Sequence, residues 1–411
     1  MNKQWRNLDN TAKVFSLDEK NNNNIFRLSA VLKEKVDLEK LKRAVIKTLN
    51  LYPNYKVKIK IGLFWNYLET NFKEPIIEEE NNIPCKNITL KKNNEFLFKV
   101  TYFKNKVNLE IFHILTDGLG ATILFKQILY NYFNLKYKLK IDNKESPNNT
   151  LYIQDEYLKN ADKKLKYKKG YKKAFIIKEK YDLSNNKTSH YILNLKKLKI
   201  ICKKHNVSIS EYLTALYTYA IYKTLYNKST KKNIVINIPI DLRKRYKVES
   251  FSNFFTCMYI EINLSSNNTI TFNKILNQVR NEFKNKLSSE NIKKYLARDV
   301  KLGTNIIIRI VPLFIKKKLM KYIRKVANKT TTTLSNIGQI KIDEEYKKYI
   351  DNIMVLTSVG DNQKVKCTVC SYENNLTITI NSNLIKNELE KEFYNLLIKY
   401  VGKVKLKNKN I

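Results

Sequence analysis

The sequence predicts an α+β protein made of two similar domains, each a mixed β-sheet with helices. Length supports this, because 411 residues are too many for one ordinary core but suit two domains of about 200 residues each. A hydrophobic share of 43% is typical of a folded chain rather than a disordered one. Both halves also show the same succession of strand-like and helix-like segments. We therefore expect two sheet-plus-helix units.

The first half of the chain is predicted to hold one sheet and two long helices. Asp37 is the expected N-cap of a helix whose apolar residues recur at helical spacing from 41 to 49. A second helix is expected over 118–134. Runs of apolar and β-branched residues predict the strands, which are expected at 25–32, 55–61, 63–68, 96–103 and 107–113.

The second half repeats this organisation. Ser210 is the expected N-cap of a long helix over 211–226. The remaining elements are strands at 234–240 and 254–262, helices at 272–287 and 313–326, a sheet-rich segment at 331–381 and a final helix at 384–401. A polar, lysine-rich stretch at 136–186 separates the halves, with its loop expected at 143–149. We divide the chain into domains 1–165 and 166–411.

The net charge of +41 invites a nucleic-acid interpretation, but the composition argues against specific binding. Arg accounts for nine of the 78 basic residues, and the Lys residues are spread over the whole chain beside abundant Asn, Ile and Tyr. Readers of nucleic acid rely on Arg forks and a localised basic stripe. The profile is typical of AT-rich codon usage. Such a surface would still attract an anionic ligand, and we expect weak association with anionic lipid headgroups.

Export and membrane signals are missing from the chain as given. The first residues lack the apolar stretch of a secretory signal, and the run at 305–315 is too short for a span and contains Arg309 and Pro312. We expect a cytoplasmic protein. Cys367 and Cys370 would point to opposite faces of a strand, so we expect no metal site there.

A histidine stands at the end of a predicted strand and just before a predicted helix. His113, Asp117 and Gly118 form the pattern H-x-x-x-D-G, and His113 continues the apolar row of the strand over 107–113. With three His and eight Gly in the chain, chance is a poor explanation of this pattern. Because the pKa of imidazole lies near neutrality, His113 is a candidate proton acceptor.

This motif and several other segments resemble the CoA-dependent acyltransferase superfamily, in its alcohol acetyltransferase-like branch. Chloramphenicol acetyltransferase and the condensation domains of nonribosomal peptide synthesis belong to the same superfamily. The other matching segments are WRNLDNTAK at 5–13, GLFWNYLE at 62–69, IPIDLR at 238–243, SNFF at 252–255 and TLSNIG at 333–338. They span most of the chain. The resemblance implies two chloramphenicol-acetyltransferase-like domains with an active-site tunnel between them.

The resemblance also implies an activity, that of an acyl-CoA-dependent O- or N-acyltransferase that transfers groups other than aminoacyl groups. His113 would act as the general base while a hydroxyl or amine attacks the thioester. Asp117 would be a structural residue paired with Arg243, and it is also the expected N-cap of its helix. Gly118 would let the backbone approach closely behind the histidine.

Further site residues are implied in the second half of the chain. Ser335 and Asn336 are candidates to donate hydrogen bonds to the oxyanion, although a Ser-Asn-x-Gly run also forms simple turns. Asn253 is a candidate tunnel residue. His190 and His205 are expected to be structural or surface residues. We expect the segment 306–326 to pack in the core, with a tunnel helix or lipid contact as the alternatives.

The expected partners are acyl-CoA as donor substrate and a small-molecule or lipid acceptor, with no permanently bound cofactor and a monomeric chain. One feature disfavours peptide condensation, because condensation domains commonly carry two successive His and this chain has Phe112 before His113. Two other hypotheses stay open. One is a catalytically silent protein of the same fold that binds an acyl ligand or peptide, and the other is a basic nucleic-acid-binding protein.

Overall fold

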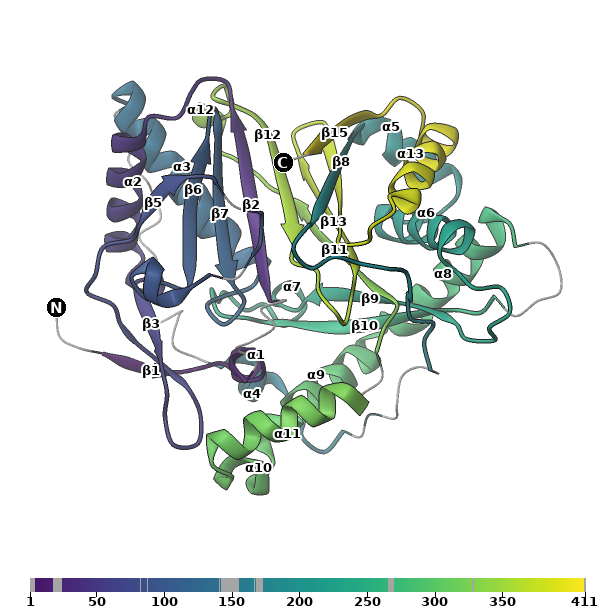
Figure 1. Ribbon diagram of the computed structural model, residues 1–411, viewed down its shortest axis with the longest axis horizontal. Coiled ribbons are helices and arrows are strands. Elements are labelled where there is room, and N and C mark those ends of the chain that lie inside the picture. The colour runs from purple at the N-terminus through teal and green to yellow at the C-terminus, as the bar shows by residue number, and fades with distance from the viewer. Residues whose placement is uncertain are drawn as a thin grey trace.

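The computed structural model describes residues 4–17, 24–81, 83–86, 88–139, 141, 155–165, 167, 173–264, 270–326 and 329–409. Two large sheets lie next to each other, and helices cover the side of each that faces away from the other (Figure 1). A small sheet and a group of helices lie across one end of both. The loop predicted at 143–149 lies outside the described residues.

The first large sheet has five strands in the order β12-β2-β7-β6-β5. Their bounds are Ile25–Leu32 (β2), Ile77–Glu79 (β5), Phe98–Phe103 (β6), Lys106–Phe112 (β7) and Ile350–Thr357 (β12). Strands β2 and β7 are almost fully buried, which fits their central place in the sheet. Strand β12 comes from the second half of the chain and pairs antiparallel with β2. The sequence pattern did not predict this exchange.

Helices α2 (Leu38–Leu51) and α3 (Gly118–Tyr137) pack with this sheet in one hydrophobic core. Asp37 accepts a hydrogen bond from the backbone of Lys40, so the predicted N-cap is confirmed. The Asn131 side chain donates to the Thr48 hydroxyl over 2.9 Å and joins the two helices. The shared core and this hydrogen bond hold α3, the helix that begins directly after Asp117, against α2.

The small sheet has the order β1-β4-β3, with bounds Trp5–Asn7 (β1), Val57–Lys60 (β3) and Tyr67–Thr70 (β4). The strand predicted at 55–61 is confirmed as the shorter β3, because Pro53–Tyr55 form a 3₁₀ turn before it. The strand predicted at 63–68 was placed too early, because residues 61–66 form the connection between β3 and β4. At Gly62 a Cβ atom would lie 2.4 Å from the Trp65 carbonyl oxygen, so the connection needs glycine there.

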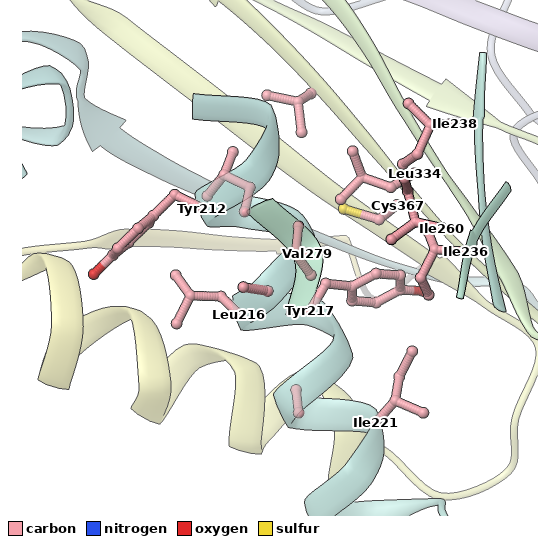
Figure 2. Packing of buried hydrophobic residues seen from close by; sticks show 14 of the residues in the cluster. Tyr212, Leu216, Tyr217, Ile221, Ile236, Ile238, Ile260, Val279, Leu334 and Cys367 are labelled. Carbon is pink, nitrogen blue, oxygen red and sulfur yellow. The ribbon is translucent and has the colours of Figure 1, made fainter. Parts of the chain in front are cut away.

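The second large sheet has seven strands in the order β10-β9-β11-β13-β14-β8-β15. Their bounds are Lys187–Asn194 (β8), Ile234–Asp241 (β9), Phe255–Ile262 (β10), Thr332–Gln339 (β11), Val365–Tyr372 (β13), Asn375–Ser382 (β14) and Lys405–Lys409 (β15). Four helices cover one face, namely α5 (Leu195–Lys204), α6 (Ile209–Thr224), α8 (Phe272–Lys286) and α13 (Glu388–Val401). Figure 2 shows Tyr217 and Ile221 of α6 beside sheet residues such as Ile236.

Two helix starts differ from the sequence predictions, and helices between 289 and 310 were not predicted. Ser208, not Ser210, caps α6, since its hydroxyl accepts from the Glu211 backbone while the Glu211 carboxylate accepts from the Ser208 backbone. The final helix begins at Glu388 rather than 384, because Leu384 still forms a β-bridge with Tyr181. Helix α9 (Ser289–Thr304) was not predicted at all, and a short helix α10 (Ile306–Ile310) follows it before α11 (Leu313–Val326).

The two large sheets meet where β12 lies on the uncovered face of β13 and β14. The Thr368 hydroxyl donates to the Val355 carbonyl over 2.5 Å, and the Asn381 amide donates to the Thr357 carbonyl over 2.8 Å. Cys367 packs in the core of the second sheet and Cys370 in the core of the first, so the predicted opposite orientation of the two thiols is confirmed. Val355 and Thr357 of β12 also border the cavity that is described below.

The remaining described elements are short, and they are α1 (Asn10–Ser16), α4 (Glu156–Asn160), α7 (Arg243–Tyr246), α12 (Glu344–Lys347) and a second 3₁₀ turn (Leu90–Asn93). Among the described residues, no helix combines the length and the apolar character needed to cross a bilayer. The domain division 1–165 and 166–411 stays a prediction, and residue 166 lies outside the described residues.

Candidate active site

His113 directly follows strand β7, which ends at Phe112. Its backbone N–H donates to the Asn24 carbonyl over 2.8 Å, which holds the residue at the end of this central strand. Three aromatic rings surround the imidazole, with centroid distances of 5.0 Å to Phe15, 4.7 Å to Phe26 and 5.5 Å to Phe255. This apolar surrounding lowers the pKa of His113 below its ordinary value of 6.5, since burial disfavours the imidazolium. The ring is therefore neutral near pH 7.

The side chain of Asn253 fixes which imidazole nitrogen carries the proton. Its amide nitrogen donates to the Asp9 carboxylate over 2.9 Å and to the His113 carbonyl over 3.1 Å. Only the NH₂ end of the Asn253 amide can donate to these two oxygens. The amide oxygen therefore faces His113 Nδ1, 3.2 Å away. Nδ1 then carries the hydrogen and donates it. The lone pair of the neutral ring consequently lies on Nε2.

Asp9 also belongs to the site, although no sequence motif marked it as a site residue. Its carboxylate accepts from the Ala12 backbone as the N-cap of α1 and from both the backbone and the side chain of Asn253. Burial raises the pKa of Asp9 to about 7, although these hydrogen bonds oppose the shift. An Asp before a helical segment was recognisable as a cap. Its contact with Asn253, 244 residues further along the chain, was not.

Asp117 is buried, and both of its carboxylate oxygens are fully engaged. One oxygen accepts from the backbone N–H groups of Leu119 and Gly120 at the start of α3, and the other accepts from the backbone of Phe254 over 2.9 Å. Arg243 Nη2 donates to both oxygens, at 3.0 and 2.9 Å. No lone pair is left to take a proton from a substrate. The geometry is that of a brace between the two halves.

Arg243 gathers several backbone groups around this ion pair. Its Nε donates to the Ser250 carbonyl over 2.7 Å, and Nη2 donates to the Ser252 carbonyl over 2.6 Å. Nη1 pairs with the more exposed Asp241 at 2.6 Å. The guanidinium thus holds the loop that carries Asn253 against the start of α3.

The two glycines that follow Asp117 differ in how strictly they are required. A Cβ atom on Gly118 would meet only the flexible end of Ile337, at 2.6 Å. On Gly120 it would lie 2.0 Å from the Thr116 hydroxyl and 2.5 Å from the backbone oxygen of Phe251. Gly120 therefore permits the close approach of the second half of the chain, a role that the motif had suggested for Gly118. The second glycine of D-G-L-G was the available signal.

A cavity of about 1370 Å³ lies between the two halves of the chain and is bordered by His113. Asp117 and Gly118 border it from the first half, and strand β11 borders it from the second. Its volume exceeds the range of about 300–1,000 Å³ that is typical of sites for one small ligand. Its exposed charged residues are three lysines, Lys244, Lys247 and Lys341, and two acidic residues, Asp241 and Glu249. The cavity has room for two substrates, and basic residues outnumber acidic ones among its exposed side chains.

Ser335 and Asn336 both border this cavity, but their side chains have different surroundings. The Asn336 amide donates to the Ser210 hydroxyl over 2.9 Å, and its oxygen accepts from the Gly338 backbone over 2.9 Å. Asn336 thus stabilises the irregular end of β11, as the turn interpretation expects. Ser335 neighbours Leu334, which is buried in the core of the second sheet, and therefore faces the other side of the strand. Ser335 thus borders the cavity from the strand face that lies away from this core.

The other two histidines lie outside the residues that border the cavity. His190 is buried within β8 and its Nδ1 lies 2.9 Å from the Thr379 hydroxyl. His205 is the C-cap residue of α5, where a helix end favours a cationic side chain.

Comparisons with known proteins identify the fold. No family model and no curated protein matches the sequence. Among solved structures, TRI3 trichothecene 15-O-acetyltransferase from Fusarium sporotrichioides aligns over 97% of this chain and 95% of its own, with a TM-score of 0.65 and 11% identity. F. graminearum TRI101 complexed with ethyl coenzyme A aligns over 98% and 100%, with a TM-score of 0.63 and 8% identity.

Two further solved structures, a condensation domain and a polyketide synthase associated protein, have a similar fold. The first condensation domain of the calcium-dependent antibiotic synthetase aligns over 97% of both chains, with a TM-score of 0.63 and 9% identity. Polyketide synthase associated protein 5 from Mycobacterium tuberculosis aligns over 97% and 98%, with a TM-score of 0.60 and 11% identity. The predicted α+β class with two chloramphenicol-acetyltransferase-like domains is thereby confirmed. The chain has the fold that these acetyltransferases and condensation domains share.

Proposed function

We propose that this protein is an acyl-CoA-dependent O- or N-acyltransferase in which His113 is the general base. The observation that carries the proposal is a neutral histidine, with its Nδ1 hydrogen bound by Asn253, at the border of a cavity between two domains. A general base needs a free lone pair near the reacting groups, and this arrangement leaves one on Nε2. The fold and the TRI101 structures with bound coenzyme A support a thioester donor.

The reaction needs one base and one donor to the oxyanion. Nε2 of His113 takes the proton of an acceptor hydroxyl or amine while that oxygen or nitrogen forms a bond to the thioester carbonyl carbon. The carbonyl oxygen becomes an oxyanion, for which the Ser335 hydroxyl is the proposed hydrogen-bond donor. The C–S bond then breaks, and the imidazolium returns its proton to the leaving CoA sulfur. No covalent enzyme intermediate is required.

The remaining residues hold the base and attract the donor. Asp117 and Arg243 brace the start of α3 against the loop carrying Asn253, and Asn253 in turn orients His113. The lysines around the cavity, Lys244 and Lys247 among them, suit the phosphates of coenzyme A. The acceptor is proposed to be a small molecule or a lipid.

A thiol-release screen tests this function directly. Acetyl- to palmitoyl-CoA is offered together with alcohols, amines and glycolipids, and free CoA is measured. We expect acceptor-dependent release with at least one pair. Saturable CoA binding without any release over the whole panel would favour the silent binding protein instead.

The fall of kcat/KM on the acid side of its pH profile, which we call the acid limb, should have its midpoint below pH 6.5. Burial lowers the pKa of His113, and only the neutral ring accepts a proton, so activity is lost as the pH falls through this lowered pKa. The measurement is kcat/KM against pH with the pair found in the screen. Because the pKa of Asp9 is raised to about 7, the profile is also measured with an Asp9→Asn variant. A limb at or above pH 6.5 in both proteins would contradict the assignment of His113 as the titrating base.

Replacing Asn253 by alanine should lower kcat/KM by about tenfold to a hundredfold. The hydrogen bond from His113 to Asn253 raises the pKa of His113, so its loss should also move the acid limb to lower pH. Asn131→Ala is the matched control, because it removes another fully buried amide that contacts Thr48 rather than the site. Lower activity with an unshifted pH profile would show that Asn253 only stabilises the fold.

A further inference from the structure

Exposed apolar side chains gather in one part of the surface, away from the cavity. Ten of the 21 exposed large apolar side chains among the described residues belong to the β3–β4 connection, α10 and α11. They are Ile61, Leu63, Phe64, Ile306, Ile307, Ile310, Phe314, Ile315, Leu319 and Tyr322. We call this set the apolar face. Helices α10 and α11 lie at the lower edge of the molecule in Figure 1. Scattered apolar residues are normal on a surface, but such a concentration marks an interaction site.

Helix α11 is turned so that its apolar side faces away from the protein. Its buried positions are Leu313, Lys316 and Met320, which share one side of the helix. Ile315 and Tyr322 lie on the opposite side and are 43% and 64% exposed. A helix that only served the core would present these side chains inward. The expectation that 306–326 packs in the core is therefore wrong for most of its described apolar side chains.

The two parts of the apolar face are held together by direct contacts. The Leu313 backbone donates to the Leu63 carbonyl over 2.8 Å, and Lys316 Nζ donates to the Phe64 carbonyl over 2.7 Å. The same ammonium lies 3.9 Å from the centre of the Trp65 ring. Burial lowers the pKa of Lys316 to about 8. The connection and the helix thus form one continuous surface.

The charged residues in the helical part of this surface are all basic. Residues 300–326 contain eight Lys and Arg and no Asp or Glu, and Lys318 and Lys321 are exposed between the apolar side chains of α11. Exposed apolar residues interspersed with lysine are typical of helices that lie in the interface of an anionic bilayer. A second copy of this chain would oppose basic surface to basic surface, which is unfavourable at a net charge of +41.

We propose that the apolar face docks the protein on an anionic lipid bilayer. The apolar side chains of α10, of α11 and of the β3–β4 connection enter the headgroup region, while the lysines contact lipid phosphates and carboxylates. The protein binds as a peripheral protein and does not span the bilayer. This inference does not depend on acyl transfer, because its readout is binding to lipid.

Vesicle binding with a charge-matched control tests this docking. Ile307→Asp/Phe314→Asp places two carboxylates in the apolar face, at side chains that are 71% and 63% exposed. Leu183→Asp/Ile200→Asp makes the same charge change at exposed apolar positions elsewhere, 54% and 58% exposed. Sedimentation is measured with phosphatidylcholine vesicles that contain or lack phosphatidylserine. Because all four sites are exposed, both variants should keep the wild-type circular dichroism and melting.

We expect the wild type and the control to bind the phosphatidylserine vesicles and to be released by salt or by omission of phosphatidylserine. The apolar-face variant should bind at least about tenfold more weakly. Equal losses in both variants would show only diffuse electrostatic attraction and would overturn the proposal. So would absence of vesicle binding by the wild type, or a wild-type dimer that the apolar-face variant converts to a monomer.

Discussion

Replacing His113 by alanine is expected to lower the turnover of CoA release by about 10²- to 10⁴-fold. The ring lies among Phe15, Phe26 and Phe255, and its Nε2 is the base that we propose for the attack on the thioester. Loss of the ring removes proton acceptance but leaves the cavity and the brace around Asp117 in place. The measurement is thiol release with the donor and acceptor found in the screen, together with a melting curve.

His205→Ala is the matched control for this experiment. It removes an imidazole from the end of α5, outside the residues that border the cavity. Activity should stay at the wild-type level. If the His113→Ala variant also kept full activity with an unchanged melting curve, His113 would not be the base, and the proposed mechanism would fail.

Replacing Asp117 by alanine is expected to cost about 3–5 kcal/mol of unfolding free energy. The change leaves the buried guanidinium of Arg243 without its main counter-charge, and it removes the cap of α3 and the acceptor of the Phe254 N–H. Because the loop carrying Asn253 depends on these bonds, activity should fall as well. Urea unfolding followed by circular dichroism measures the stability change.

Asp241→Ala separates this effect from the loss of any carboxylate near Arg243. Asp241 contacts the same guanidinium but its side chain is 41% exposed, so its removal should cost about 1 kcal/mol or less. Unchanged unfolding of the Asp117→Ala variant, together with lost activity, would give Asp117 a direct role in the chemistry. That result would contradict the brace that we describe.

Local elements could be predicted well because their causes are local. The spacing of apolar residues predicted α2 and its Asp37 cap, and the strand leading to His113 followed from its apolar row. Where competing local signals were close together, the prediction slipped by a few residues. Ser208 and Ser210 are both suitable caps, and only the reciprocal bond with Glu211 selects Ser208.

Elements that depend on distant partners were missed or misjudged. The apolar strand β12 was recognisable as a strand, but its pairing with β2 joins residues more than 300 positions apart. The apolar residues of 306–326 have the pattern of a core helix. Which side of α11 faces the protein depends on contacts with Leu63 and Phe64, which periodicity does not encode.

The residues of the candidate site also differ in whether local sequence or distant contacts determine their place. The sequence by itself determined where the proposed base lies, because a histidine after a buried strand and before a capped helix is a local pattern centred on His113 and Asp117. The tertiary structure alone decided that Asn253 fixes the tautomer of that histidine, that Asp9 holds Asn253, and that Gly120 meets a distant backbone. The first two roles arise from hydrogen bonds, and the third from close packing, between segments that are far apart in the chain. Such bonds need buried atoms within about 3 Å of each other, a condition that only the packed fold creates.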